Sequence, residues 1–178
     1  MIGTDTLTGE RADLLGSLRK HRFFLRHTTR ELTAVQAAAA PTASALCLGG
    51  LIKHVARVEE QWARFILDGP AAMTGSAKKW TEWTDADYAV WESSFRMRPG
   101  ETLASVLADY ERVAARTDEL IAAVDLDAAH PLPEAPWFEP GARWSARRVL
   151  LHIIAETAQH AGHADIIRET IDGAKSMG

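Results

Sequence analysis

Four long stretches of this chain repeat apolar residues every three or four positions, which is the spacing of one face of an α-helix. They span residues 8–32, 48–67 and 103–124, and the segment between Ser145 and Gly173. No stretch shows the sustained alternation of apolar and polar residues that marks a β-strand, and no internal repeat is present. Because each amphipathic helix must bury one face, the pattern predicts an all-α fold, an up-and-down four-helix bundle with long connections.

The ends of these helices are marked by capping residues. Thr8, Thr102 and Ser145 are predicted N-caps, because their side-chain oxygens can accept a hydrogen bond from a free N–H of the first turn. The run Asp68-Gly69-Pro70 should end the second helix, and Gly173 the fourth.

The connections are less regular. Within residues 68–100 a short helix is expected at about 85–95, and the tryptophans Trp80, Trp83 and Trp91 must be sheltered. HPLPEAPWFEPGARW, at 130–144, contains four prolines and is predicted to cross the bundle as a rigid, non-helical segment. Trp62 and Trp91 are expected to be core residues.

Composition narrows the class of protein. The 178 residues are 47% hydrophobic and 25% charged, which predicts one globular domain over residues 1–178. A net charge of −4 with scattered basic residues provides no field for nucleic acid. Cys47 has no partner for a disulfide and is expected to be a small buried hydrophobe. With no secretory signal and no membrane-length apolar run, we expect a soluble, cytoplasmic protein.

The fourth helix carries four polar side chains on one narrow arc. At about 100° per residue, His152, Glu156, His160 and His163 fall within about 80° of one another. Apolar residues continue this arc at both ends, so we expect it to face the core. Burying polar groups without partners costs about 1–3 kcal/mol each, so something must compensate them.

A divalent metal ion would compensate these groups most economically. Glu156 and His160 lie four residues apart and can bind one ion from a single helix face. His54, in GGLIKHVARVEEQW, is well placed inside the second helix to be the third ligand, whereas the histidines of the first helix and of the proline-rich loop are expected to be solvated. This donor set suits Zn²⁺, with Ni²⁺, Mn²⁺ and Fe²⁺ left open, and three protein ligands leave positions free for catalysis.

Other polar residues have structural interpretations. His152 is one turn further from the predicted pair than His163, and is either a structural residue or a partner of a ligand. Glu59 and Glu60 are expected to form solvated ion pairs with Arg57 and Arg64. The histidines as a set could also be packed core residues of a non-catalytic helical module.

The segments GGLIKHVARVEEQW and VLLHIIAETAQHAGHADIIRE, with their spacing, resemble the DinB-like superfamily. More narrowly they are similar to its actinobacterial branch, which includes mycothiol-dependent maleylpyruvate isomerase and the mycothiol S-transferases. The resemblance implies a metal site with His54 from the second helix and Glu156 and His160 from the fourth, a His–Glu–His set that the isomerase also uses. After the last ligand the usual R-G-Q is Ala161-Gly162-His163, so His163 could donate to a substrate, replace a water or join the metal shell.

The resemblance also implies a reaction. An open metal site can lower the pKa of the mycothiol thiol for attack on a small electrophile. We expect a metal-dependent S-transferase active in detoxification, with His163 as the candidate catalytic residue. Because the chain ends with the bundle, without the isomerase's further domain, isomerisation is not expected. A metal-dependent hydrolase with His163 as general base stays open as an alternative.

The back of the fourth helix suggests an assembly. This helix is also apolar away from the polar arc, at Leu151, Ile154, Ala155, Ala158 and Gly162. A helix that is apolar nearly all round is usually covered on both sides. Either the tryptophan-rich connection or a second subunit covers it, and we expect a homodimer.

Overall fold

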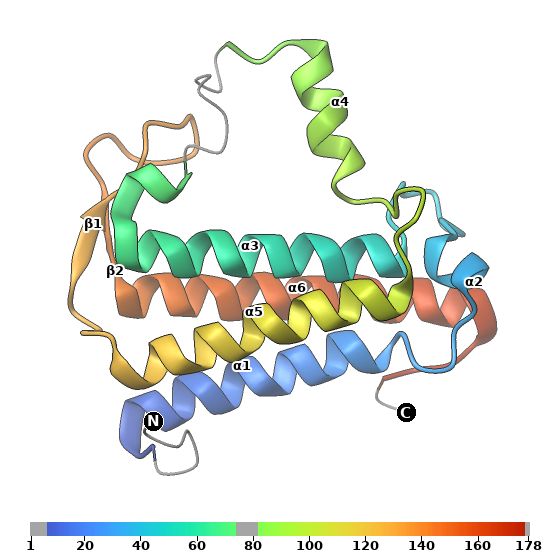
Figure 1. The fold of residues 1–178 in the computed structure, drawn as a ribbon, viewed down its shortest axis with the longest axis horizontal. Helices are drawn as coiled ribbons and strands as arrows, with labels where there is room; N and C mark the ends of the chain where they lie inside the picture. The colour runs from blue at the N-terminus through green and yellow to red at the C-terminus, as the bar shows by residue number, and fades with distance from the viewer. Residues whose placement is uncertain (1–6, 74–81, 177–178) are drawn as a thin grey trace.

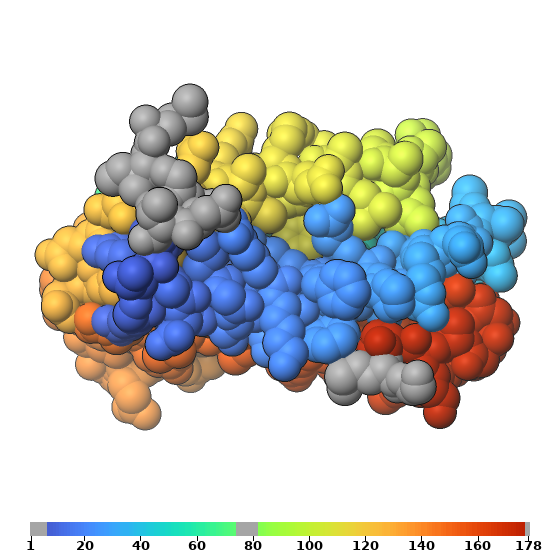
Figure 2. Space-filling view, turned by 90° about the horizontal axis from the view of Figure 1, so that it is seen from below, coloured from blue at the N-terminus to red at the C-terminus, as the bar shows by residue number. Residues whose placement is uncertain are grey.

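The computed structural model describes residues 7–73 and 82–176, and in this part of the chain four long helices lie side by side (Figure 1). These are α1 (Gly9–His27), α3 (Leu48–Asp68), α5 (Leu103–Ala123) and α6 (Ala146–Asp172). Helix α3 packs against α5 and α6, and α1 packs mainly against α6. Figure 2 shows α1 in blue between α5 in yellow and α6 in orange to red. The predicted all-α bundle is confirmed.

Shorter elements connect the long helices. They are α2 (Ala34–Ala38), the 3₁₀ helix η2 (Gly69–Met73), α4 (Asp85–Ser93), β1 (Ala129–Pro131) and β2 (Arg143–Ser145). Helix α4, the short helix expected near 85–95, stands away from the bundle above α3 in Figure 1. The strands β1 and β2 pair antiparallel, with His130 opposite Trp144. The sequence predicted no strand here, because a three-residue strand is too short to show alternation.

Most predicted helix ends are confirmed. The Thr102 hydroxyl accepts a hydrogen bond from the Ser105 N–H (3.1 Å), and the Ser145 hydroxyl accepts one from the Arg148 N–H (3.2 Å). Gly69 and Gly173 follow α3 and α6 with φ of 67° and 77°, values that few residues except glycine adopt. Thr8 precedes α1 with extended backbone, but its side chain makes no capping hydrogen bond.

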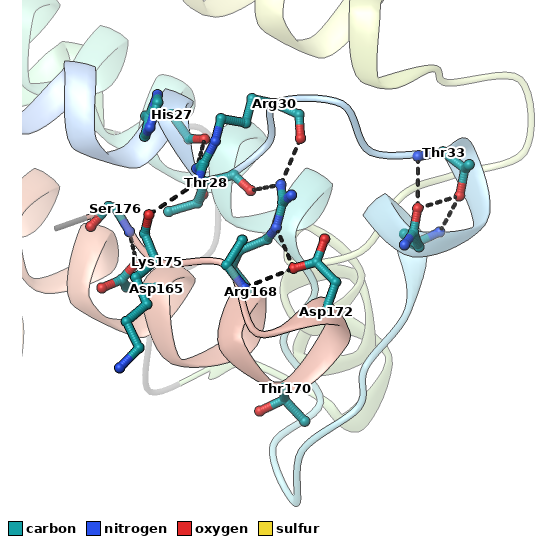
Figure 3. A network of polar contacts seen from close by, with 12 residues as sticks. His27, Thr28, Arg30, Thr33, Asp165, Arg168, Thr170, Asp172, Lys175 and Ser176 are labelled. Atoms are coloured by element: carbon teal, nitrogen blue, oxygen red, sulfur yellow. Dashed lines mark hydrogen bonds and ion pairs between the residues drawn. The ribbon is translucent and has the colours of Figure 1, made fainter. Parts of the chain in front are cut away.

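Helix α1 ends at His27, although the periodicity continues to residue 32. The buried guanidinium of Arg168 on α6 donates to the carbonyl oxygens of Thr28 (2.8 Å) and Arg30 (2.6 Å), and to the Asp172 carboxylate (2.8 Å) (Figure 3). These carbonyls can accept because the helix has ended. A residue far away in the sequence therefore stabilises the end of α1, which local periodicity cannot reveal.

A polar layer divides the apolar core. We call Arg22, Glu59 and Asp118 the buried ion-pair cluster. The guanidinium of Arg22 donates to both carboxylate oxygens of Glu59, at 3.1 Å from Nε to Oε2, and to Asp118 Oδ1 at 2.6 Å. The expectation that Glu59 is solvated was wrong, since its exposed fraction is 0%. It lies four residues after Val55 and three before Trp62, on the buried face of α3.

The tryptophans behave differently from one another. Trp62 is a core residue, as expected. The same expectation for Trp91 was wrong, because this residue lies on α4 outside the bundle and is 41% exposed. Trp83 is half-buried, and Trp80 lies outside the described residues. Among the described helices, none is long and apolar enough to cross a bilayer.

Candidate metal centre

Helices α3 and α6 bring together the three side chains predicted as metal ligands, His54, Glu156 and His160, which we call the ligand triad. One donor atom from each residue can be chosen so that all three lie within 4.8 Å of one another. His160 Nε2 is 3.7 Å from Glu156 Oε2, and the His54 and His160 rings meet edge to face with centroids 4.8 Å apart. Helices α3 and α6 pack side by side and run in opposite directions (Figure 1), and the contact between the His54 and His160 rings joins them.

The ligand triad lies at the edge of the core. The innermost line of α6 is formed by Ile153, Thr157, Ala161 and Ala164, all of which are buried. The triad residues are half-buried, and the Glu156 side chain keeps 28% exposure. The expectation that the polar arc faces the core directly was therefore wrong by a fraction of a turn. This position leaves the donor atoms open toward solvent on one side.

Burial sets the charge of the triad. It lowers the pKa of His54 from 6.5 to about 4, with His160 and Arg57 adding smaller effects. Burial also lowers the pKa of His160 and raises that of Glu156. Both imidazoles are thus neutral near pH 7, which is the form that binds a metal. In the described part of the chain neither His54 nor Glu156 makes a hydrogen bond, so the partly exposed Glu156 carboxylate has no donor from the protein. Two imidazoles and one such carboxylate fit a divalent cation.

His152 and His163 flank the triad on opposite sides. His152 Nε2 lies 3.9 Å from Glu156 Oε1, the oxygen that does not face His160. Its ring also touches Trp62 and Trp144, at centroid distances of 4.8 and 5.2 Å. His152 therefore belongs to an aromatic cluster beside the triad.

His163 contacts the triad through His160. The two Nδ1 atoms are 3.4 Å apart, a long hydrogen bond, whereas His160 Nε2 faces Glu156. His163 thus lies behind His160, on the side away from the carboxylate. Away from the site, His130 was expected to be solvated; that was wrong, since it is half-buried with Nε2 3.2 Å from the Ile66 carbonyl oxygen.

One residue of the site was missed by the sequence reasoning. Phe95 stacks on the His54 ring, with centroids 4.2 Å apart and planes inclined by 27°. It follows α4 in an irregular segment, where periodicity gives no signal. A separate groove of about 230 Å³ runs between α3 and α5, lined by Lys53, Arg57 and Glu101 among others. None of the triad residues lines it, so we place the candidate site at the triad.

Comparisons with known proteins bear on the fold and the family of the chain. A conserved protein from Enterococcus faecalis shares the fold with a TM-score of 0.68 at 13% identity, over 94% of this chain and 100% of that one. This likeness shows the fold alone. No curated protein matches the sequence. A family described as Mycothiol-S-transferase matches residues 13–173, nearly the whole chain. On that match, the chain belongs to the mycothiol S-transferase family.

Proposed function

We propose that this protein is a metal-dependent S-transferase that joins mycothiol, or a similar low-molecular-weight thiol, to an electrophilic substrate in detoxification. The observation that carries the proposal is the convergence of the ligand triad from α3 and α6 in a chain of this family. Zn²⁺ is the first candidate for the ion, and Ni²⁺, Mn²⁺ and Fe²⁺ accept the same donor set.

His54, Glu156 and His160 would hold the ion, which would lower the pKa of the thiol so that the thiolate exists at neutral pH. Three protein ligands leave positions open for a substrate. In the transfer, the sulfur lone pair forms a C–S bond to the electrophile, the leaving group departs with its bonding electrons, and the thiol proton is released. The ligand triad would position the ion for this step, and Cys47 takes no part.

We propose that His163 serves the site through His160. A hydrogen bond between their Nδ1 atoms would fix the tautomer of His160 and leave its Nε2 free for the ion, as partners of metal-bound histidines commonly do. The direct catalytic role expected of His163 from the sequence stays a prediction. His152 would act on the other side, where it lies near the second oxygen of Glu156.

We also propose that residues 1–178 form one domain and that two copies associate through α6. Leu151 and Ile166 on this helix are 47% and 62% exposed, and burying them would favour a homodimer. Sedimentation of the purified protein as a strict monomer would remove the dimer from the proposal.

The test is a thiol-transfer assay on protein purified without chelators. The metal content is measured first, and consumption of mycothiol is then followed with monobromobimane and chlorodinitrobenzene. We expect one ion per chain and metal-dependent turnover, both lost in His54→Ala and retained in the control His21→Ala on α1. Metal-loaded protein that consumes no mycothiol but hydrolyses esters or amides without a thiol would replace the proposal by a hydrolase.

A further inference from the structure

The orientation of the His54 ring lacks the usual support. A metal-binding histidine almost always donates its second N–H to a carboxylate or carbonyl, which fixes the ring. The other histidine of the triad, His160, has a ring nitrogen as its partner, His163 Nδ1 at 3.4 Å. In the described part of the chain the His54 ring makes no hydrogen bond, and the two aromatic rings packed against it are those of Phe95 and His160.

Phe95 covers a face of this ring. The centroid distance of 4.2 Å and the small inclination of 27° describe a stacked pair, whereas His160 meets His54 at 77°. Stacking limits rotation of the imidazole about its side-chain bonds, because a turned ring would collide with the phenyl group. Aromatic pairs of this kind contribute beyond the area that they bury.

Gly50 of α3 allows Phe95 to lie so close, and Gly49 makes room for Met97. A Cβ atom on Gly50 would lie 1.8 Å from the Phe95 carbonyl oxygen, and one on Gly49 would lie 2.5 Å from Met97 Sδ. A side chain at position 50 would push the Phe95 backbone off the first turn of α3, whereas one at position 49 would displace the Met97 side chain. His54 follows Gly50 by one turn on the same helix. The residue against which the Phe95 backbone packs and the ring that Phe95 covers therefore belong to one rigid element.

Hydrogen bonds hold the same segment from both sides. The Cys47 thiol, at the N-cap of α3, lies 3.8 Å from the Phe95 carbonyl oxygen. Lys53 Nζ donates to the Arg96 carbonyl oxygen at 3.2 Å and to the Glu101 carboxylate at 2.9 Å. The position of Phe95 is therefore fixed by α3 itself.

We propose that Phe95 is a positioning residue of the metal site: stacking on His54 takes the place of the missing hydrogen bond and aims the ring at the ion. The phenyl group also keeps water from this side of the donor atoms. The inference rests on the proposed function for its place in catalysis, but its test uses metal binding alone.

Co²⁺ is a suitable probe, because its visible absorption bands report the geometry of the ligands. Metal-free protein is titrated with Co²⁺ for the wild type and for Phe95→Ala, Phe95→Leu and Phe95→Tyr. We expect Phe95→Ala and Phe95→Leu to weaken Co²⁺ binding by about 10–100-fold, as loss of a ligand's partner does, and to change the absorption bands. Phe95→Tyr, which keeps the aromatic face, should restore affinity and spectrum. Phe23→Ala, an exposed aromatic on α1, is the matched control and should bind like the wild type.

A second variant tests the position of Phe95 without changing its side chain. Gly50→Ala alters no group near the donor atoms but displaces the Phe95 backbone, so it should weaken Co²⁺ binding in the same direction. Circular dichroism at the titration temperature identifies the folded variants on which the comparison is made. Unchanged affinity and spectrum in Phe95→Ala, or wild-type behaviour of Phe95→Leu, would overturn the inference.

The outcomes also separate this inference from the proposed function. Wild-type protein that binds Co²⁺ as expected but transfers no mycothiol would remove the proposed function and leave the role of Phe95 standing. Wild-type protein that binds no Co²⁺ would remove both.

Discussion

The ligand triad and the buried ion-pair cluster share helix α3, and they differ in how their charges are compensated. In the buried cluster, Arg22 donates to both oxygens of Glu59 and to Asp118, so the protein supplies every partner. In the triad, the carboxylate of Glu156 is 3.7 Å from the nearest triad nitrogen and accepts no hydrogen bond within the described residues. Arg22 and Glu59 of the first cluster are buried and Asp118 lies at its edge, whereas all three triad residues are half-buried.

The difference separates polar groups whose partners lie within the protein from polar groups that we propose bind a metal ion. A buried charge is tolerated only when it is paired and hydrogen-bonded. The ion-pair cluster meets this condition and needs nothing further. The triad is not buried in this way: its carboxylate faces solvent and has no donor from the protein, and a cation would take that place. Substitutions in the two clusters should therefore affect different measurable quantities.

The largest expected effect is the loss of a triad ligand. Glu156→Ala or His54→Ala should abolish stoichiometric metal binding and lower thiol-transfer activity by about 1,000-fold or more, since losing a mere partner of a ligand already costs 10–100-fold. The metal-free variants should unfold at the same urea concentration as the wild type, or higher. Elemental analysis measures the bound metal. Urea denaturation of the wild type and the variants, all in the presence of a chelator, measures stability. A metal-free variant destabilised like a core mutant would place the triad among the structural groups.

Glu59→Ala should produce the opposite pattern. It leaves the Arg22 charge buried without its main partner, and we expect a loss of about 3–5 kcal/mol in the free energy of unfolding. The folded fraction should still bind one metal ion. Chemical denaturation provides the measurement. Glu60→Ala, at the exposed neighbouring position, is the control and should change stability by less than about 0.5 kcal/mol. Equal stability of the two variants would contradict a structural role for the buried cluster.

The pH dependence of the metal-free protein should report the triad. The unfolded chain binds protons at His54 as the pH falls through 6.5, whereas the folded pKa is about 4. Between these values the unfolded state holds more protons, so the free energy of unfolding decreases as the pH is lowered. We expect His54 to account for about 2 kcal/mol of this loss between pH 7 and pH 5. Urea denaturation of the wild type and of His54→Phe tests this; parallel pH curves for the two proteins would refute it.

The last comparison concerns His163. If it fixes His160, His163→Ala should lower metal affinity by about 10–100-fold, with a matching fall in activity that excess metal restores. A residue that takes part in proton transfer would instead leave affinity unchanged and alter the pH profile of kcat. Metal titration together with kcat measured at saturating metal decides between the two roles.

The long helices and the members of the triad could be predicted from the sequence, because both follow local spacing. Glu156 and His160 are one turn apart, and His54 stands out inside an apolar helix. The structure brings these three residues together, and their role as ligands stays a prediction until metal is measured.

Features set by distant contacts could not be predicted in this way. The partner of Glu59 is Arg22, 37 residues earlier. Local spacing favoured the nearby Arg57 and Arg64 instead. Phe95 reaches His54 from an irregular segment, and its signal was the pair Gly49-Gly50 rather than its own surroundings. The early end of α1 depends likewise on Arg168, from the last helix.

The ion pair inside the core has a consequence for residues that it never touches. Glu59 follows His54 by five residues on one uninterrupted helix, about 7.5 Å along its axis. Since Arg22 of α1 donates to both oxygens of that carboxylate, α3 is held against sliding lengthwise past α1. The position along α6 at which His54 lies is thereby set from inside the bundle. Shortening the carboxylate side chain, as in Glu59→Asp, would shift the His54 ring nitrogens, five residues away on the same helix.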